Sequence, residues 1–163
     1  MRHRRFTSWV TALMLAAVIG SAVVDGFDLV DVWGVDDATV TSTGADGTVL
    51  TVRYPTVTRP ALASPFEIVV ERPGGFDDQL EIEVDNRFLQ LWDLNGIFPS
   101  PAEERSGGDT TIWVFDPPDG ERFTVFYEAR IEPAMQSERV RATVSLLDPS
   151  ETLRVRFETR VRP

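Results

Sequence analysis

The strongest constraint on the fold is a two-residue alternation of apolar and polar side chains that recurs through the second half of the chain. It is clearest in residues 80–85, 123–131, 140–146 and 153–161. Side chains of a β-strand point alternately to its two faces, so this period predicts strands with one buried face and one solvated face. No segment of helical length shows a period of 3.6 residues.

Shorter apolar runs predict further strands at residues 49–54, 66–72, 87–92 and 110–115, and Trp113 is expected to lie in the core of a central strand. Turn-forming sequences separate the runs: Arg59-Pro60, Pro73-Gly74-Gly75, Asn95-Gly96, Pro99-Ser100-Pro101, Pro117-Pro118-Asp119-Gly120 and Asp148-Pro149-Ser150. About seven or eight short strands with such turns favour an all-β fold, an antiparallel β-sandwich of the immunoglobulin-like or fibronectin-III-like kind.

The N-terminus predicts export. Residues 1–5 are cationic and residues 6–24 carry no charge, and a helix of 19 residues spans roughly 28 Å, close to the hydrocarbon core of a bilayer. We expect an uncleaved signal-anchor over residues 1–24, with a transmembrane helix in the lipid bilayer at residues 6–24. Its N-terminus would be cytoplasmic and the remaining chain outside the cell membrane. The alternative is a signal peptide cleaved near Ala22, which would release a secreted domain.

The segment from 25 to 47 is acidic and then rich in Thr, Ser and Gly. Because such a composition buries little apolar surface, it predicts an extended or disordered stalk. The extracytoplasmic β-sandwich domain is then expected to occupy residues 48–163.

Composition removes several kinds of chemistry. All 16 basic residues are Arg, there is no Cys, and the one His is His3. Thiol and Schiff-base chemistry, His-based triads and His/Cys metal sites are therefore not expected, nor is a cofactor or an enzymatic activity. Asp93, Asn95 and Gly96 begin like a calcium loop, but the spacing of an EF-hand fails after them. The net charge of −10 also disfavours nucleic-acid binding.

Residues 50–163 resemble a family of single-pass, immunoglobulin-like exported proteins of high-GC bacteria. The resemblance rests on Tyr54-Pro55, Thr58-Arg59-Pro60, Leu62, Pro73-Gly74-Gly75-Phe76, Asp93-x-Asn95-Gly96, Pro99-x-Pro101, Trp113-x-Phe115, Glu132-Pro133 and Phe157-x-Thr159-x-Val161-x-Pro163. The exclusive use of Arg fits a GC-rich genome. The resemblance implies a fold and a topology, and it brings no activity with it.

The first candidate interaction surface is a set of arginines in the last two predicted strands: Arg139, Arg141, Arg154, Arg156, Arg160 and Arg162. If Asp148-Pro149-Ser150 closes a hairpin, Arg141 lies opposite Glu158 and Arg139 opposite Arg160. The arginines then share one face, which could bind carboxylates or phosphates of a partner. The alternative is a solvated face whose arginines pair with Glu81 and Glu83 of a neighbouring strand.

The second candidate is the connection from Phe88 to Pro101, with Trp92 and Phe98. Aromatic side chains on a loop can bind a partner or stack on a sugar, or they can plug one end of a sandwich. The function expected from the whole sequence is a membrane-tethered binding module for another envelope or membrane protein. A module that binds cell-wall carbohydrate or another anionic polymer is the alternative.

Overall fold

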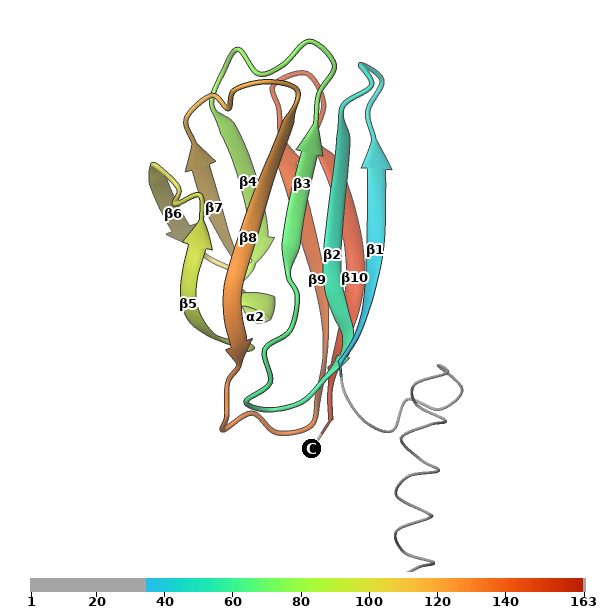
Figure 1. Cartoon of the computed structure of the whole chain (residues 1–163), viewed down its shortest axis with the longest axis vertical. Helices are drawn as coiled ribbons and strands as arrows, with labels where there is room; N and C mark the ends of the chain where they lie inside the picture. The colour runs from blue at the N-terminus through green and yellow to red at the C-terminus, as the bar shows by residue number, and fades with distance from the viewer. Residues whose placement is uncertain (1–34, 163) are drawn as a thin grey trace, which may run out of the picture. The chain divides into compact units, whose positions relative to one another are not determined.

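The alternating segments fold as strands, and the structure, a computed structural model that describes residues 35–162, is all-β over that range (Figure 1). The predicted all-β class is therefore confirmed. The predicted signal-anchor and the first part of the predicted stalk lie outside the described residues. Residues 35–162 contain no apolar helix of the length that a bilayer span requires.

The strands cover most of the described chain, and a single short helix interrupts them. They are β1 (Asp36–Thr43), β2 (Val49–Thr58), β3 (Glu67–Glu71), β4 (Leu80–Asp85), β5 (Trp92–Phe98), β6 (Glu103–Gly107), β7 (Thr110–Phe115), β8 (Arg122–Ile131), β9 (Glu138–Leu147) and β10 (Leu153–Val161), with α2 (Asn86–Leu89) between β4 and β5.

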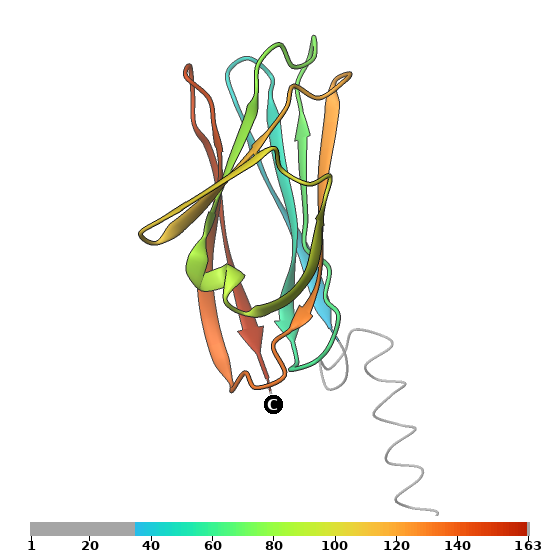
Figure 2. The same cartoon turned by 90° about the vertical axis from the view of Figure 1, so that its left-hand side faces the viewer.

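The strands form one ten-stranded sheet with the order β5-β8-β3-β2-β10-β9-β4-β7-β6, and β1 pairs with β2 beside this path. All pairings are antiparallel except the short parallel contact of β10 with β2, at Arg160–Val57 and Val161–Thr58. Figure 2 shows how the sheet curls until its two halves face each other. The pairing therefore makes a curled, mixed half-barrel, in place of the two separate antiparallel sheets that the sequence predicts.

The core fills the space between the two halves of the sheet. Apolar side chains from alternate positions of β2, β3, β4, β7, β8, β9 and β10 are buried there, and Trp113 is only 1% exposed, as predicted. Phe88 of α2 and Phe66, just before β3, join them, with ring centroids 4.8 Å apart. Burial of this apolar surface stabilises the domain. The chain has no Cys, so no disulfide adds to this stability.

Strand β1 corrects the prediction of a stalk that reaches residue 47. Residues 36–43 pair with β2 through eight antiparallel register positions, and Val40 packs against the core. Every second residue of β1 is partly buried, and β-branched Thr and Val at 39–41 suit a half-buried strand. The acidic composition of the segment led to the prediction of a stalk in spite of this pattern. The folded domain begins by Asp36.

The region from 87 to 107 differs most from the prediction. The run at 87–92, expected as a strand, instead forms the turn of α2, in which the N–H of Gln90 donates to the carbonyl of Asn86 at 2.9 Å. The connection that follows contains β5, and β6 has no counterpart among the predicted strands. All of β6 is exposed, so its sequence carries no apolar alternation.

Candidate functional site

The hairpin of β9 and β10 has the register that its sequence predicts. Arg141 lies opposite Glu158, and Arg139 lies opposite Arg160. Asp148 fixes the turn, because its Oδ1 accepts hydrogen bonds from the backbone N–H of Ser150 at 2.9 Å and from the Ser150 hydroxyl at 2.6 Å. Such a side-chain acceptor closes the chain in a tight turn and so sets the pairing of both strands.

Five arginines of this hairpin therefore share its outer surface: Arg139, Arg141, Arg154, Arg156 and Arg160, here named the arginine face. The residues between them, such as Val140, Val155 and Phe157, point into the core. At a rise of about 3.3 Å per residue, the arginines of β10 extend over about 20 Å. The guanidinium groups thus sit on two paired strands whose opposite sides are held by core packing.

Glu158 is the acidic partner within the arginine face. Its carboxylate forms an ion pair with Arg139 at 3.2 Å and accepts a hydrogen bond from Arg141 at 3.1 Å. Among the residues that the structure describes, Arg154, Arg156 and Arg160 form no ion pair. The alternative pairing with β4 is not present, because Glu81 pairs with Arg105 and Glu83 accepts from the hydroxyl of Thr110.

The arginine face is a local exception in an acidic domain. Residues 35–163 contain 13 Arg against 23 Asp and Glu, yet this face holds five Arg and one Glu. The acidic side chains of β4 are separated from β10 by β9, where Thr143 and Ser145 stand opposite Arg156 and Arg154. A cationic surface of this kind attracts carboxylate or phosphate groups.

Trp92 does not belong to a binding platform, which corrects one predicted interaction residue. It is 7% exposed, and its indole packs against the rings of Phe88 and Tyr127 at 5.6 and 5.8 Å. Trp92 therefore plugs the core, the alternative that the sequence left open. Its indole N–H has no acceptor among residues 35–162.

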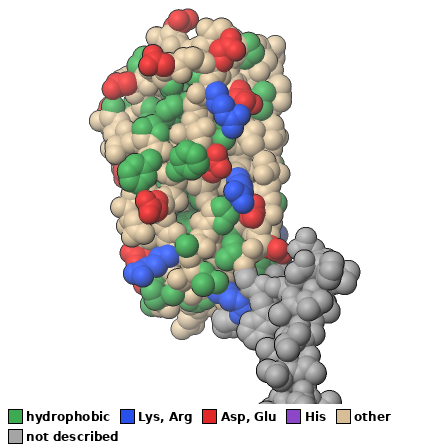
Figure 3. All heavy atoms as spheres, viewed as in Figure 1, with side chains coloured by type: hydrophobic (Ala, Val, Ile, Leu, Met, Phe, Trp, Pro, Cys, Tyr) green, Lys and Arg blue, Asp and Glu red, His purple; other side chains and the backbone are tan. Residues whose placement is uncertain are grey.

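Phe98 lies on the outer surface, 54% exposed, and the structure pairs it with a residue that the prediction missed. Phe126 of β8 stands opposite Phe98 in the register and is equally exposed. The signal was present, because Phe126 occupies a position of β8 where the alternation calls for a polar side chain. Figure 3 shows hydrophobic and charged side chains mixed on the face that carries β8, β3 and β2.

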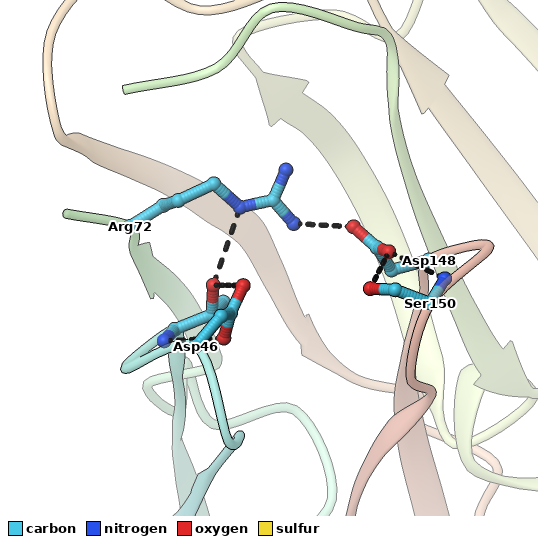
Figure 4. A network of polar contacts seen from close by, with 5 residues as sticks. Asp46, Arg72, Asp148 and Ser150 are labelled. Atoms are coloured by element: carbon cyan, nitrogen blue, oxygen red, sulfur yellow. Dashed lines mark hydrogen bonds and ion pairs between the residues drawn. The ribbon is translucent and has the colours of Figure 1, made fainter. Parts of the chain in front are cut away.

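A polar cluster fastens the turn of the hairpin to the rest of the sheet (Figure 4). Arg72, after β3, donates to Asp148 at 2.7 Å and to the hydroxyl of Thr48 at 3.3 Å. Thr48 in turn donates to Asp46 from its hydroxyl and its backbone N–H, both at 2.8 Å. One guanidinium thus joins the β1–β2 loop, the end of β3 and the β9–β10 turn.

The same contacts lower the pKa of both aspartates. The backbone N–H and hydroxyl of Thr48 stabilise the charged form of Asp46, so the pKa of Asp46 lies below its usual range. The hydroxyl and N–H of Ser150, followed by the charge of Arg72, lower the pKa of Asp148. Both carboxylates are therefore ionised at neutral pH and act as acceptors.

Asp93, the first of the residues that resemble the start of a calcium loop, has another role. Asp93 lies in β5 and accepts two hydrogen bonds from Arg130 of β8, at 2.8 and 2.7 Å. Over residues 35–162, no three acidic or His side chains converge on a point that could hold a metal ion.

Comparison with known proteins adds one finding. No family model and no curated protein matches the chain. Among solved structures, the chain is similar to the one described as "AvmM Catalyzes Macrocyclization in Alchivemycin A Biosynthesis". The two share 12% sequence identity with a TM-score of 0.39, and the match covers 79% of this chain and 89% of that chain.

Proposed function

We propose that this protein is a membrane-tethered, extracytoplasmic binding module, and that its arginine face binds an acidic surface of another envelope or membrane protein. The observation that carries the proposal is the set of three arginines, Arg154, Arg156 and Arg160, without ion-pair partners among residues 35–162. The proposed activity is binding, and no His, Lys or Cys follows residue 24 to act as a base or nucleophile.

The physical basis is electrostatic. A guanidinium presents a planar fork of donors that matches a carboxylate, and two such groups on alternate residues of one strand lie about 7 Å apart. Because the strands are held by the core and the turn is held by the Arg72 cluster, the backbone of the arginine face needs no ordering on binding, and within the domain mainly the arginine side chains lose conformational freedom. The acidic remainder of the domain repels an acidic partner elsewhere and so selects the orientation of approach.

The proposed tether limits where the partner can be. Eleven residues, 25–35, connect the proposed membrane span at 6–24 to β1. A fully extended chain of that length reaches about 40 Å. The partner would therefore expose its acidic surface close to the membrane. Cleavage near Ala22 would remove this limit.

We also infer a relation to the immunoglobulin-like class, and with it to the high-GC exported family. Strands β2, β3 and β8 occupy one half of the sheet and β10, β9 and β4 the other, with β10 parallel to β2. This is the arrangement expected of an immunoglobulin-like Greek key. In this arrangement β5 extends the half that contains β8, and the β6–β7 hairpin extends the half that contains β4.

The test is recovery of the partner with the full-length protein, extracted in mild detergent from the cells that make it. The double variant Arg154→Gln, Arg156→Gln should lose the partner. The control, Arg87→Gln with Arg122→Gln, removes the same charge from exposed arginines elsewhere and should retain it. Equal recovery with both double variants would refute the role of the arginine face.

A second candidate function, binding of cell-wall carbohydrate, is favoured by one observation, the exposed pair of Phe98 and Phe126. Aromatic rings on a sheet surface can stack on sugars. Retention on isolated cell wall that is lost in Phe126→Ser, and kept when Arg154 and Arg156 are changed to Gln, would establish this function in place of the first.

A further inference from the structure

The sheet is not closed, and its two end strands border a groove on one side of the molecule. The strand order ends at β5 and at β6, and within the described residues β5 pairs only with β8 and β6 only with β7. A groove of about 330 Å³ lies at this opening and is lined by Leu94 and Ile97 of β5 and by Glu104 of β6. We name it the seam groove. Figure 2 looks onto this side.

The β5 wall and the floor of the seam groove are apolar, and the polar part of its lining consists of Asn86, Gln90, Glu104, Ser106 and Thr111. Leu94 is 45% exposed, and Ile97 and Leu89 are half-buried beside it. Trp113 and Tyr127 form the floor, with their rings stacked at 5.8 Å. An apolar opening next to two unpaired strand edges offers both features that a β-strand needs, main-chain hydrogen bonds and burial for alternate side chains.

The charge in the seam groove is negative. Glu104 points to the same side of β6 as Trp113 does of β7, since the two residues are opposite each other in the register. Within residues 35–162, Glu104 forms no ion pair. Burial, together with the charge of Glu104, raises the pKa of Tyr127 to about 12, so the carboxylate acts on the floor of the groove. The groove therefore favours a cation.

We propose that the seam groove binds an extended peptide segment that pairs with the free edge of β5 and directs a Lys or Arg side chain to Glu104. Side chains of a strand that are two residues apart point the same way. Every second residue of the segment therefore faces the groove. The basic residue is one of these, and the inward-facing residues on either side of it are apolar and cover Leu94 and Ile97. The arginine face lies four strands away at β10 and takes the opposite charge, so this proposal stands or falls independently of the proposed function.

The test uses the full-length protein in detergent micelles and a labelled probe peptide, Thr-Val-Thr-Arg-Thr-Val-Thr. We expect saturable binding, measured by fluorescence anisotropy, that weakens about tenfold in Glu104→Gln. Leu94→Ser should also weaken it, whereas Leu62→Ser, at an exposed leucine outside the groove, should not. A peptide with Glu in place of Arg, or with Pro in place of the third residue, should not bind.

Three results would overturn the proposal. The first is no saturable binding of the Arg peptide up to about 1 mM. The second is equal binding of the Glu peptide or the Pro peptide, which would point to a surface that recognises neither charge nor a strand. The third is loss of binding in the Arg154→Gln, Arg156→Gln variant with retention in Glu104→Gln, which would place the peptide on the arginine face.

Discussion

At the scale of single residues, the domain depends on polar groups placed where several chain segments meet. Arg72 is the clearest case, because its guanidinium contacts both Asp148 and Thr48 and also lies over the ring of Phe76 at 5.4 Å. Neither its sequence neighbours nor its spacing indicated this role. The contacts arise from loops separated by as many as 76 positions, which only the folded chain brings together.

The lowered pKa of Asp148 predicts that the free energy of unfolding falls at acid pH. Its pKa is lowered in the folded state, so the stability it contributes is complete above the unfolded value of about 3.9 and is lost as the pH falls through the lower folded value. Asp148→Asn keeps an acceptor for Ser150 but loses the charge. We expect a loss of about 1 kcal/mol at pH 7, because Asp148 is about one-fifth exposed.

Urea unfolding of the wild type and of Asp148→Asn should show this difference at neutral pH and a smaller difference at about pH 2. A difference that is the same at both pH values would show that the charge of Asp148 is not the cause.

The raised pKa of Tyr127 predicts that the free energy of unfolding falls at alkaline pH. Because its folded-state pKa is raised to about 12 by burial and by Glu104, its contribution is complete below the ordinary value of 10.0 and is lost as the pH rises toward 12. In a Tyr54→Phe background, ultraviolet absorbance reports Tyr127 alone. Its phenol should titrate near 12, and earlier in Glu104→Gln. Titration near 10 in the folded protein would mean that the ring is solvated.

At the scale of elements, the sequence was most informative where a strand is buried on one face and closed by a tight turn. The register of β9 and β10 followed from their alternation and from Asp148-Pro149-Ser150. The sequence pattern did not predict β1 and β6, which lie at edges and bury little. It also did not predict α2, whose short apolar run has no period that distinguishes a strand from a helix. Edge strands form because a neighbour supplies the pairing, and a single sequence does not show that neighbour.

Strand β1 can be tested in the full-length chain with two adjacent substitutions. Val40 packs against the core and Thr41 is exposed, so Val40→Asp should lower the free energy of unfolding by about 1–3 kcal/mol. Thr41→Asp should change it by about 0.5 kcal/mol or less. If residues 36–43 were a stalk, both substitutions would leave urea unfolding unchanged.

At the scale of the whole molecule, charge is distributed unequally. The chain carries a net charge of −10, and three arginines that form no ion pair among residues 35–162, Arg154, Arg156 and Arg160, lie on one strand of one hairpin. Composition showed the net charge, and strand alternation placed the arginines on one face. The position of Arg141 opposite Glu158 followed from the predicted hairpin register. The pairing of Glu81 with Arg105 did not, because Arg105 lies in β6, a strand that the sequence does not indicate.

The most direct test of the central claim is photo-crosslinking in the cells that make the protein, with a photoreactive residue at position 143 or at position 124. Both positions hold a half-buried threonine of a strand. Position 143 stands opposite Arg156 of the arginine face, whereas position 124 lies on β8. We expect one envelope or membrane protein to be captured from position 143 and not from position 124. Capture from position 124 alone, or from neither position, would contradict the account.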